Sequence, residues 1–253
     1  MNTTKSIALS RKLKALPLTL ITYVLGAVIV VVLFIPAFLL ALIPERWRPQ
    51  KLFFWMMHLI YTAIVWALFV RVKVVNKKGM PSELAIFVAN HESSIDIPLL
   101  GYLMKGRPHF WYIYERYTKM PIFGYFARQI GVTVTQRESA TDARTLVKGI
   151  REVAERKCST LLFPEGGRFV DGTIHDFYAG FALIAKKLQQ PVIPVYMRNP
   201  GRVYPPGSFF IYHYPITLII GPSFYFNEND TNEAFVQRIH DWFVEQACDG
   251  ELK

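Results

Sequence analysis

The chain has 253 residues, of which 52% are hydrophobic, and carries a formal net charge of +10. A basic chain of this size would ordinarily suggest a nucleic-acid partner. Residues 1–80 carry eleven Lys or Arg and one acid, whereas residues 81–253 carry eighteen of each sign. The excess charge therefore belongs to the N-terminal part, and we expect no nucleic-acid partner.

Two uncharged apolar runs occupy the N-terminal part, residues 18–43 and 52–70. As a helix, the first run exceeds the ~30 Å hydrocarbon thickness of a bilayer. A cleaved signal peptide is the alternative for this run, but its apolar core is too long. A buried core helix is the alternative for the second run, which His58 interrupts. We predict two linked membrane helices, either spanning the bilayer or lying in one leaflet.

Basic residues cluster before the first run and after the second, with fewer between them. By the positive-inside tendency, both ends of this hairpin face the cytoplasm or an anionic leaflet. We therefore expect residues 1–74 to form a membrane-associated helical segment on the cell inner membrane. Residues 75–253 are expected to form a domain on its cytoplasmic face.

Short β-rich runs alternate with helical patterns after residue 70. Strands are predicted at residues 71–76, 84–90, 109–114, 131–136, 159–164, 191–197 and 216–221. A helix is predicted at 140–157, with an apolar face that includes Val147 and Val153, and another at 231–248, with Thr231 as its cap. This alternation predicts an α/β fold with a mixed, mostly parallel sheet flanked by helices and preceded by the two-helix membrane hairpin.

The first chemical motif is NHESSID at residues 90–96, directly after a predicted strand. Five positions along a regular helix would place His91 and Asp96 about 140° apart around its axis. They can meet only if His91 lies on the strand-to-helix turn and Asp96 lies in the first turn of the helix. Asp96 would then accept a hydrogen bond from one imidazole nitrogen, and the other nitrogen could take a proton from a substrate hydroxyl.

Other interpretations of this motif are weaker. Ser93 or Ser94 could cap the helix with His91 present incidentally, and we expect one of them to do so even in a catalytic arrangement. A zinc site of the His-Glu-x-x-His type would need a second histidine where Ile95 stands. A nucleophilic serine would need a Gly-x-Ser-x-Gly elbow, which the chain lacks. Cys158 and Cys248 are too isolated for a thiolate metal site or a disulfide framework, and we expect both to be packing residues.

The second motif is FPEGGRF at residues 163–169, also after a predicted strand. Gly166 and Gly167 permit backbone conformations in which amide hydrogens converge on an anion, and the guanidinium of Arg168 suits a phosphate. Glu165 could hold a hydroxyl-bearing substrate or orient Arg168. A plain turn with a solvated arginine is the alternative. Because both motifs follow the carboxyl ends of strands, we expect them to share one edge of the sheet.

Together these motifs resemble the lysophosphatidic-acid acyltransferases, a family of glycerolipid acyltransferases. Four blocks occur in the order of that family: NHESSID, GVTVTQR, FPEGGR and VIPV, within a resemblance that covers about residues 75–225. It implies transfer of a fatty acyl group from acyl-CoA or acyl-ACP to the free hydroxyl of 1-acyl-sn-glycerol-3-phosphate, giving phosphatidic acid. The implied partners are membrane lipids, a lysophospholipid acceptor and the acyl donor, with no covalent acyl-enzyme, cofactor or metal.

The resemblance also implies roles for individual residues. His91 would be the general base, Asp96 would orient it, and Arg168 would bind the acceptor phosphate. The other implied substrate-binding residues are Arg137, Glu165, Gly166, Gly167 and Pro194. Gly167 stands where the family commonly has threonine, which leaves the acceptor open. Another lysolipid, such as a lyso-ornithine lipid or a lysophospholipid under remodelling, is an alternative, as is a membrane-tethered lipid hydrolase.

Overall fold

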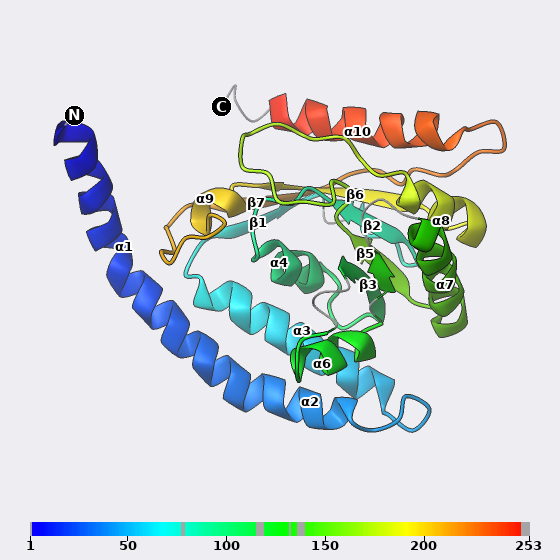
Figure 1. Ribbon diagram of the computed structural model, residues 1–253, viewed down its shortest axis with the longest axis horizontal. Coiled ribbons are helices and arrows are strands. Elements are labelled where there is room, and N and C mark those ends of the chain that lie inside the picture. Colours follow the sequence, from blue (N-terminus) through cyan, green and yellow to red (C-terminus); the bar gives the residue numbers. More distant parts are fainter. Residues whose placement is uncertain (1, 77–78, 115–118, 132, 136–139, 249–253) are drawn as a thin grey trace.

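A computed structural model describes residues 2–76, 79–114, 119–131, 133–135 and 140–248. Figure 1 shows a central sheet with helices on both faces and a long N-terminal helix along one side. The strands are β1 (Val72–Val75), β2 (Ile86–Ala89), β3 (His109–Tyr114), β4 (Thr133–Thr135), β5 (Ser159–Leu162), β6 (Val192–Arg198) and β7 (Ile216–Ile220). Every predicted strand therefore has a counterpart in the structure.

The seven strands form one sheet in the order β1-β7-β6-β2-β5-β3-β4. Neighbouring strands run parallel except β6 and β7, which are antiparallel. The predicted mixed, mostly parallel sheet is confirmed. Since β2 lies between β5 and β6, the loops that follow β2 and β5 emerge side by side at one edge of the sheet.

Helices precede the sheet, connect its strands and close the chain. They are α1 (Asn2–Ile29), the π-helix η1 (Val30–Phe34), α2 (Ile35–Ala41), α3 (Gln50–Ala67), α4 (Asp96–Leu103), α6 (Phe123–Gln129), α7 (Ala140–Arg156), α8 (Gly180–Leu188), α9 (Pro200–Val203) and α10 (Asn232–Cys248). Thr231 caps α10 as predicted, because its Oγ1 accepts a 3.1 Å hydrogen bond from the Ala234 N–H. On α7, Val153 is buried as predicted, whereas Val147 is exposed.

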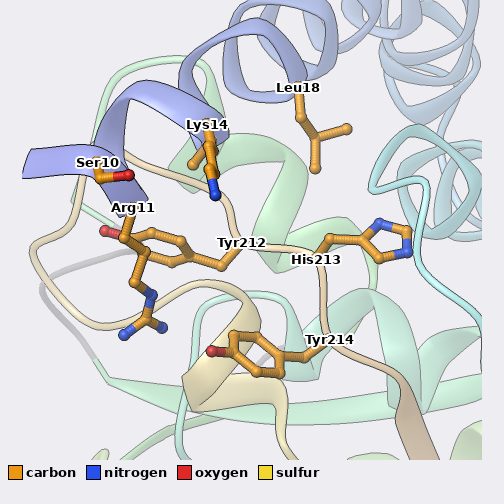
Figure 2. Close-up of a pocket in the computed structure, with 8 residues that line it drawn as sticks. Ser10, Arg11, Lys14, Leu18, Tyr212, His213 and Tyr214 are labelled. Atoms are coloured by element: carbon orange, nitrogen blue, oxygen red, sulfur yellow. The ribbon is translucent and has the colours of Figure 1, made fainter. Parts of the chain in front are cut away.

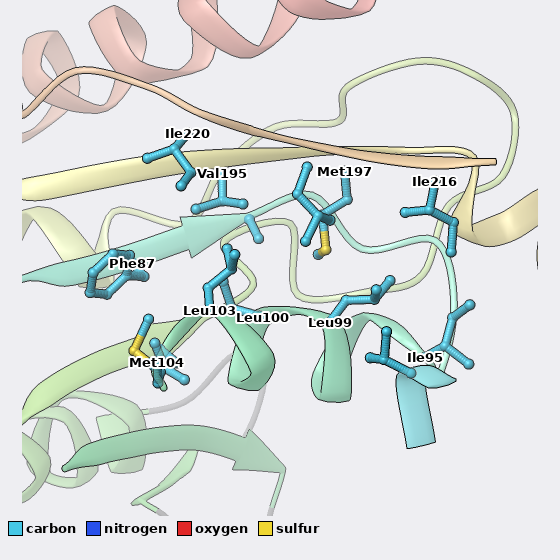
Figure 3. Close-up of a cluster of buried hydrophobic side chains, with 14 of the residues drawn as sticks. Phe87, Ile95, Leu99, Leu100, Leu103, Met104, Val195, Met197, Ile216 and Ile220 are labelled. Carbon is cyan, nitrogen blue, oxygen red and sulfur yellow. The ribbon is translucent and has the colours of Figure 1, made fainter. Parts of the chain in front are cut away.

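Strand β2 contributes apolar side chains to both faces of the sheet. Phe87 and Ala89 pack with α4, while Ile86 and Val88 pack with α8 and α10. Figure 3 shows the first of these layers, in which leucines of α4 lie against β2, β6 and β7. A strand buried on both faces carries an uninterrupted apolar run, as this one does. The rigid layer beneath α4 fixes the position of its first residue, Asp96.

The two apolar N-terminal runs have different structures. The continuous helical stretch Ser10–Ala41 is 32 residues long with a mean hydropathy of 3.0 in its most apolar window, only 11% of which is buried. Helix α3 instead buries one face, including Phe53 and Tyr61, and packs against α4. At their contact, a Cβ on Gly101 would lie 2.5 Å from the Tyr61 ring, so the two helices approach closely.

By length and composition, the stretch Ser10–Ala41 is the one described helix that could cross a membrane. The predicted second membrane helix is not supported, because α3 belongs to the packed domain. Its apolar run has the same composition as a membrane helix, but one of its faces is covered by α4 and by α1. The predicted boundary after residue 74 falls inside β1, which pairs with β7 in the sheet.

The turn between α2 and α3 touches the domain. Glu45 Oε2 lies 3.2 Å from Arg156 Nη2 at the end of α7. Arg48 is buried, and its Nη1 donates a 3.3 Å hydrogen bond to Gln129 Oε1 at the end of α6. The turn between α2 and α3 is thus fastened beside the α/β domain, as Figure 1 also shows.

The two cysteines differ in their surroundings. Cys158 is buried in a small cluster with Phe110 and Val153. Cys248, at the end of α10, is exposed. The prediction that both are packing residues is therefore wrong for Cys248.

Candidate active site

The loop after β2 begins with an asparagine that is tied to the neighbouring strand. Asn90 Oδ1 accepts a 2.7 Å hydrogen bond from the Met197 N–H, and Asn90 Nδ2 donates a 2.9 Å hydrogen bond to the Met197 carbonyl. The side-chain amide thus replaces the backbone pairing that β2 would otherwise continue with β6. This pins the start of the loop that carries His91.

His91 and Asp96 meet in the geometry expected from their spacing. Asp96 is the first residue of α4, and His91 lies on the preceding loop. His91 Nδ1 donates a 2.7 Å hydrogen bond to Asp96 Oδ2. With Nδ1 protonated, Nε2 of the neutral ring is a hydrogen-bond acceptor. The arrangement thus leaves a basic nitrogen on a side chain that is 15% exposed.

Asp96 also organises the backbone of the loop. The carboxylate is fully buried, and its Oδ2 accepts further hydrogen bonds from the N–H groups of Glu92 at 2.7 Å and Ser93 at 2.8 Å. Burial of a carboxylate is tolerated when hydrogen-bond donors surround it. One oxygen therefore fixes both the imidazole and the turn on which the imidazole is carried.

The predicted serine cap is wrong. Ile95 occupies the N-cap position of α4 and provides no side-chain cap. Ser93 Oγ instead donates a 2.6 Å hydrogen bond to the Tyr204 carbonyl. Ser93 Oγ also accepts a 3.4 Å hydrogen bond from the Ile95 N–H, but Ile95 is itself the cap residue and not the N2 or N3 position that a capping side chain bonds.

The second motif contacts the first through four residues. The Phe163 ring stacks on the His91 ring, with centroids 4.0 Å apart and an angle of 10° between the planes. Glu165 Oε1 accepts a 3.0 Å hydrogen bond from the His91 N–H, and the Phe169 N–H donates a 2.9 Å hydrogen bond to the His91 carbonyl. Arg168 Nη1 donates a 2.6 Å hydrogen bond to Ser94 Oγ. His91 is therefore held by its ring, its N–H and its carbonyl.

Glu165 is buried between two backbone segments. Its other oxygen, Oε2, accepts a 3.3 Å hydrogen bond from the His175 N–H. Burial raises the pKa of Glu165 to about 7, although the backbone hydrogen bonds act in the opposite direction. Since each oxygen accepts a backbone N–H, the contacts describe Glu165 as a brace for the His91 loop and give no support to a role in orienting Arg168.

Glu92 is a second, half-buried carboxyl group beside the histidine. Its Oε2 accepts a 3.1 Å hydrogen bond from the Gly201 N–H. The pKa of Glu92 is raised to about 7, chiefly by burial and to a lesser degree by the nearby charges of Asp96 and Glu165, while the hydrogen bond from the Gly201 N–H acts in the opposite direction. Three carboxyl groups, those of Glu92, Asp96 and Glu165, thus lie along the loop that carries His91.

The glycines of the second motif have distinct surroundings. Gly166 has φ +63°, a left-handed conformation that glycine adopts without strain. A Cβ on Gly167 would lie 3.0 Å from the Phe169 ring, which in turn stacks on the His175 ring at 3.7 Å. The absence of a side chain at Gly167 therefore leaves room for the Phe169 ring.

One predicted site residue, Pro194, is not brought to this cluster. Pro194 lies within β6, where its ring is close to Gly221 on the side covered by α10. Arg137 lies outside the described residues. Within those residues, no group of three or more His, Cys, Asp or Glu side chains is arranged to hold a metal ion.

Several residues of the cluster were not singled out from the sequence. Asn90 and Phe163 were inside the quoted motifs, but their contacts with Met197 and His91 cross between strands. His175 forms a second histidine–carboxylate pair, in which Nε2 lies 2.8 Å from Asp171 Oδ2. The Asp-x-x-x-His spacing of this pair is common in sequences and gave no signal.

Comparison with known proteins identifies the class. A family model described as Acyltransferase matches residues 71–198, about half of the chain. The chain therefore belongs to the acyltransferase family. The matched region contains both motifs and all strands from β1 to β6.

Relatives of known activity narrow the comparison. A chloroplast 1-acyl-sn-glycerol-3-phosphate acyltransferase of Brassica napus is 26% identical over 88% of this chain and 64% of its own length. The corresponding enzyme of Saccharomyces cerevisiae is 30% identical over 53% of this chain and 45% of its own length. The crystal structure of the 1-acyl-sn-glycerophosphate acyltransferase PlsC from Thermotoga maritima matches with a TM-score of 0.80 and 22% identity, covering 96% of this chain and 98% of that one. The family resemblance inferred from the motifs is confirmed.

Proposed function

We propose that the protein is a membrane-bound acyltransferase that moves a fatty acyl group from acyl-CoA or acyl-ACP to the free hydroxyl of 1-acyl-sn-glycerol-3-phosphate, giving phosphatidic acid. The observation that carries the proposal is the 2.7 Å contact between His91 Nδ1 and Asp96 Oδ2, with Nε2 left as an acceptor. The relatives named above are enzymes of this activity.

In the proposed reaction, His91 Nε2 accepts the proton of the acceptor hydroxyl as that oxygen attacks the thioester carbonyl carbon. The new C–O ester bond forms, the C–S bond breaks, and the departing thiolate takes the proton from His91. Asp96 stabilises the imidazolium that exists between these two proton transfers. No covalent acyl-enzyme is needed, and no other reactant is consumed.

Arg168 is the proposed ligand for the acceptor phosphate. Its side chain is exposed, yet one guanidinium nitrogen is fixed by Ser94, one residue before the helix cap of α4. A guanidinium anchored at one nitrogen keeps its remaining N–H groups for an anion. The acceptor phosphate would then lie within reach of the same loop that carries His91.

The proposed location is the cytoplasmic leaflet of the inner membrane, reached through α1 and α2. Exposed apolar side chains line this stretch, including Val24, Val31 and Leu39. The contacts of Glu45 and Arg48 with the domain keep the turn between α2 and α3 beside α6 and α7. These contacts favour insertion into one leaflet, because a spanning helix would separate that turn from the domain.

A different acceptor is the second candidate. A lyso-ornithine lipid O-acyltransferase of Pseudomonas aeruginosa is 30% identical over 47% of this chain and 46% of its own length. Gly167 also departs from the family pattern in the motif that would bind the acceptor.

Product analysis separates these functions. Purified protein would be given lysophosphatidic acid or lyso-ornithine lipid, each with acyl-CoA and with acyl-ACP, and the lipids would be resolved by mass spectrometry. We expect phosphatidic acid as the main product. If acylated ornithine lipid were the only acylated product, the second candidate function would replace the proposed one. Release of free fatty acid without an acylated acceptor would identify a hydrolase.

A further inference from the structure

A cavity of about 600 Å³ lies between α1 and the segment that joins α9 to β7. Figure 2 shows its two walls. Residues on successive turns of α1 form one wall, and three consecutive residues of the segment form the other. The lining residues are Ser10, Arg11, Lys14, Ala15, Leu18, Tyr212, His213 and Tyr214. None of them belongs to either motif, so the cavity is separate from the candidate active site.

The cavity is basic and aromatic. The Arg11 guanidinium lies 4.4 Å from the centroid of Tyr212 and 5.5 Å from that of Tyr214. The Arg202 guanidinium also lies 4.5 Å from the centroid of the Tyr214 ring. No carboxylate lines the cavity, and within the described chain neither Arg11 nor Lys14 forms an ion pair with one. Stacked guanidinium groups keep their N–H edges available for an anion.

Two anchors hold the segment wall in place. The Ile211 N–H donates a 3.0 Å hydrogen bond to Thr19 Oγ1, which is buried on α1. At the other end, the Tyr204 carbonyl accepts the hydrogen bond from Ser93 Oγ. The cavity is therefore built from a segment that is fastened both to α1 and to the loop of the active site.

The position of the cavity along α1 points to a lipid. Immediately after it, α1 exposes large apolar side chains, including Leu20, Ile21 and Val24. At 1.5 Å per residue, Arg11 lies about two to three helical turns from this apolar surface. Arginine, lysine and tyrosine favour this depth, where headgroup phosphates meet the hydrocarbon. Ala15 and Leu18 give the cavity an apolar edge on the same side.

We propose that this cavity binds the phosphate of an anionic phospholipid from the surrounding leaflet. Arg11 and Lys14 supply the positive charge, and Tyr212 and Tyr214 hold the Arg11 guanidinium in position. The inference goes beyond acyl transfer to the acceptor, and it rests on the proposed membrane association alone. A free phosphate ion has the same charge chemistry, but it would gain nothing from the adjoining apolar surface of α1.

The test measures lipid binding without turnover. The full chain, in neutral detergent micelles, is titrated with phosphatidylglycerol or phosphatidylcholine, and bound lipid is counted by native mass spectrometry. Arg11→Ala/Lys14→Ala should weaken phosphatidylglycerol binding by about tenfold or more, since each cation near an anionic surface contributes ~1 kcal/mol. Lys186→Ala/Lys187→Ala, which removes two exposed cations from α8, is the matched control and should bind as the wild type does.

Two further variants distinguish a built site from general attraction between charges. Arg11→Lys keeps the charge but loses the stacked plane, and Tyr214→Leu removes a phenol ring without changing charge. Each should weaken phosphatidylglycerol binding several-fold, and His91→Ala should leave it unchanged even if catalysis fails. Wild-type binding by both Arg11→Lys and Tyr214→Leu would overturn the site. Equal binding of the two lipids, or displacement of phosphatidylglycerol by inorganic phosphate at a similar concentration, would overturn the assignment to an anionic lipid.

Discussion

Arg168 and Ser94 join the two motifs directly, through a 2.6 Å hydrogen bond from Nη1 to Oγ. Seventy-four positions separate them in the chain. Because β2 and β5 are adjacent and parallel, the loops that follow them meet at the same edge of the sheet. The proposed anion ligand and the proposed general base are therefore linked by one loop-to-loop contact, as a substrate with both a phosphate and a hydroxyl would require.

Replacement of Arg168 tests the phosphate contact. Arg168→Ala should raise the Michaelis constant for lysophosphatidic acid by about tenfold to a hundredfold, since a charge-assisted hydrogen bond contributes ~1.5–3 kcal/mol. Arg168→Lys should raise the Michaelis constant less than Arg168→Ala does, because lysine keeps the positive charge but lacks the planar guanidinium that binds a phosphate through two nitrogens. Ser94→Ala should have a smaller effect in the same direction. Steady-state kinetics with the acceptor varied would measure all three, and an unchanged constant for Arg168→Ala would mean that the phosphate binds elsewhere.

Replacement of His91 tests the general base. His91→Ala should lower the turnover number by about 10²–10⁴-fold, the usual contribution of general acid–base catalysis. Asp96→Asn should also lower it, because an amide cannot stabilise the imidazolium and its NH₂ group would oppose the N–H groups of the turn. Circular dichroism and detergent-solution gel filtration would verify that each variant is folded. Near-normal turnover by His91→Ala would remove the dyad from the mechanism.

Much of this site followed from local sequence pattern. The strands were identifiable as short apolar runs, and the five-residue spacing of His91 and Asp96 required the turn geometry that the structure contains. The strand order was not predictable, because the pairing of β7 between β1 and β6 depends on contacts between distant segments. For the same reason, the stacking of Phe163 on His91 had no signature in the sequence.

Other errors came from tertiary contacts that override local composition. The run that forms α3 is uncharged, yet Phe53 is fully buried in the domain while Trp66 on the same helix is 75% exposed. Hydropathy averages over both faces and cannot distinguish them. The serine cap failed because Ser93 lies before the cap residue Ile95 and its Oγ donates to the carbonyl of Tyr204, 111 positions away in the chain.

The raised pKa of Glu92 predicts a pH dependence of stability. The pKa of Glu92 is about 7 in the folded protein, against an ordinary value of 4.5. Between these values the folded state binds more protons than the unfolded state, so the free energy of unfolding falls as the pH rises. Glu92→Gln should remove up to ~1.4 kcal/mol per pH unit of this slope within that window.

Chemical unfolding in detergent solution across this pH range would measure the slope. Glu228→Gln, at an exposed position, is the matched control and should keep the wild-type slope. His109 acts in the opposite direction, because burial lowers its pKa to about 4 and its contribution is lost as the pH falls below 6.5. The comparison between variants is therefore more informative than the wild-type curve. Identical slopes for Glu92→Gln and the control would contradict the assignment.

Two glycine substitutions test whether α3 is part of the folded domain. Gly101→Ala would place a methyl group 2.5 Å from the Tyr61 ring and should destabilise the protein by about 1–3 kcal/mol through overpacking. Gly26→Ala on α1 is the control, because no atom lies within 4 Å of the added carbon. Thermal unfolding in detergent should show a lower midpoint for Gly101→Ala alone. Equal midpoints would mean that α3 is not packed on α4 as described.

The ion pair between Glu45 and Arg156 predicts on which side of the membrane the turn after α2 lies. If α1 and α2 enter one leaflet, the turn at residues 42–49 lies on the same side of the membrane as the domain. Exposed Cys248 marks the side of the domain, and Trp47, 67% exposed in the turn, is the position to probe. Cys158 is buried and should not react.

Sealed vesicles of known orientation would be treated with a membrane-impermeant maleimide. The wild type, through Cys248, and the Trp47→Cys/Cys248→Ser variant should be labelled in vesicles of the same orientation. Labelling in opposite orientations would show that the apolar helix spans the bilayer, and would contradict the proposed arrangement in which the Glu45–Arg156 and Arg48–Gln129 contacts hold the turn beside the domain. Glu45→Gln should leave the labelling pattern unchanged, because the buried Arg48 still holds the turn beside α6.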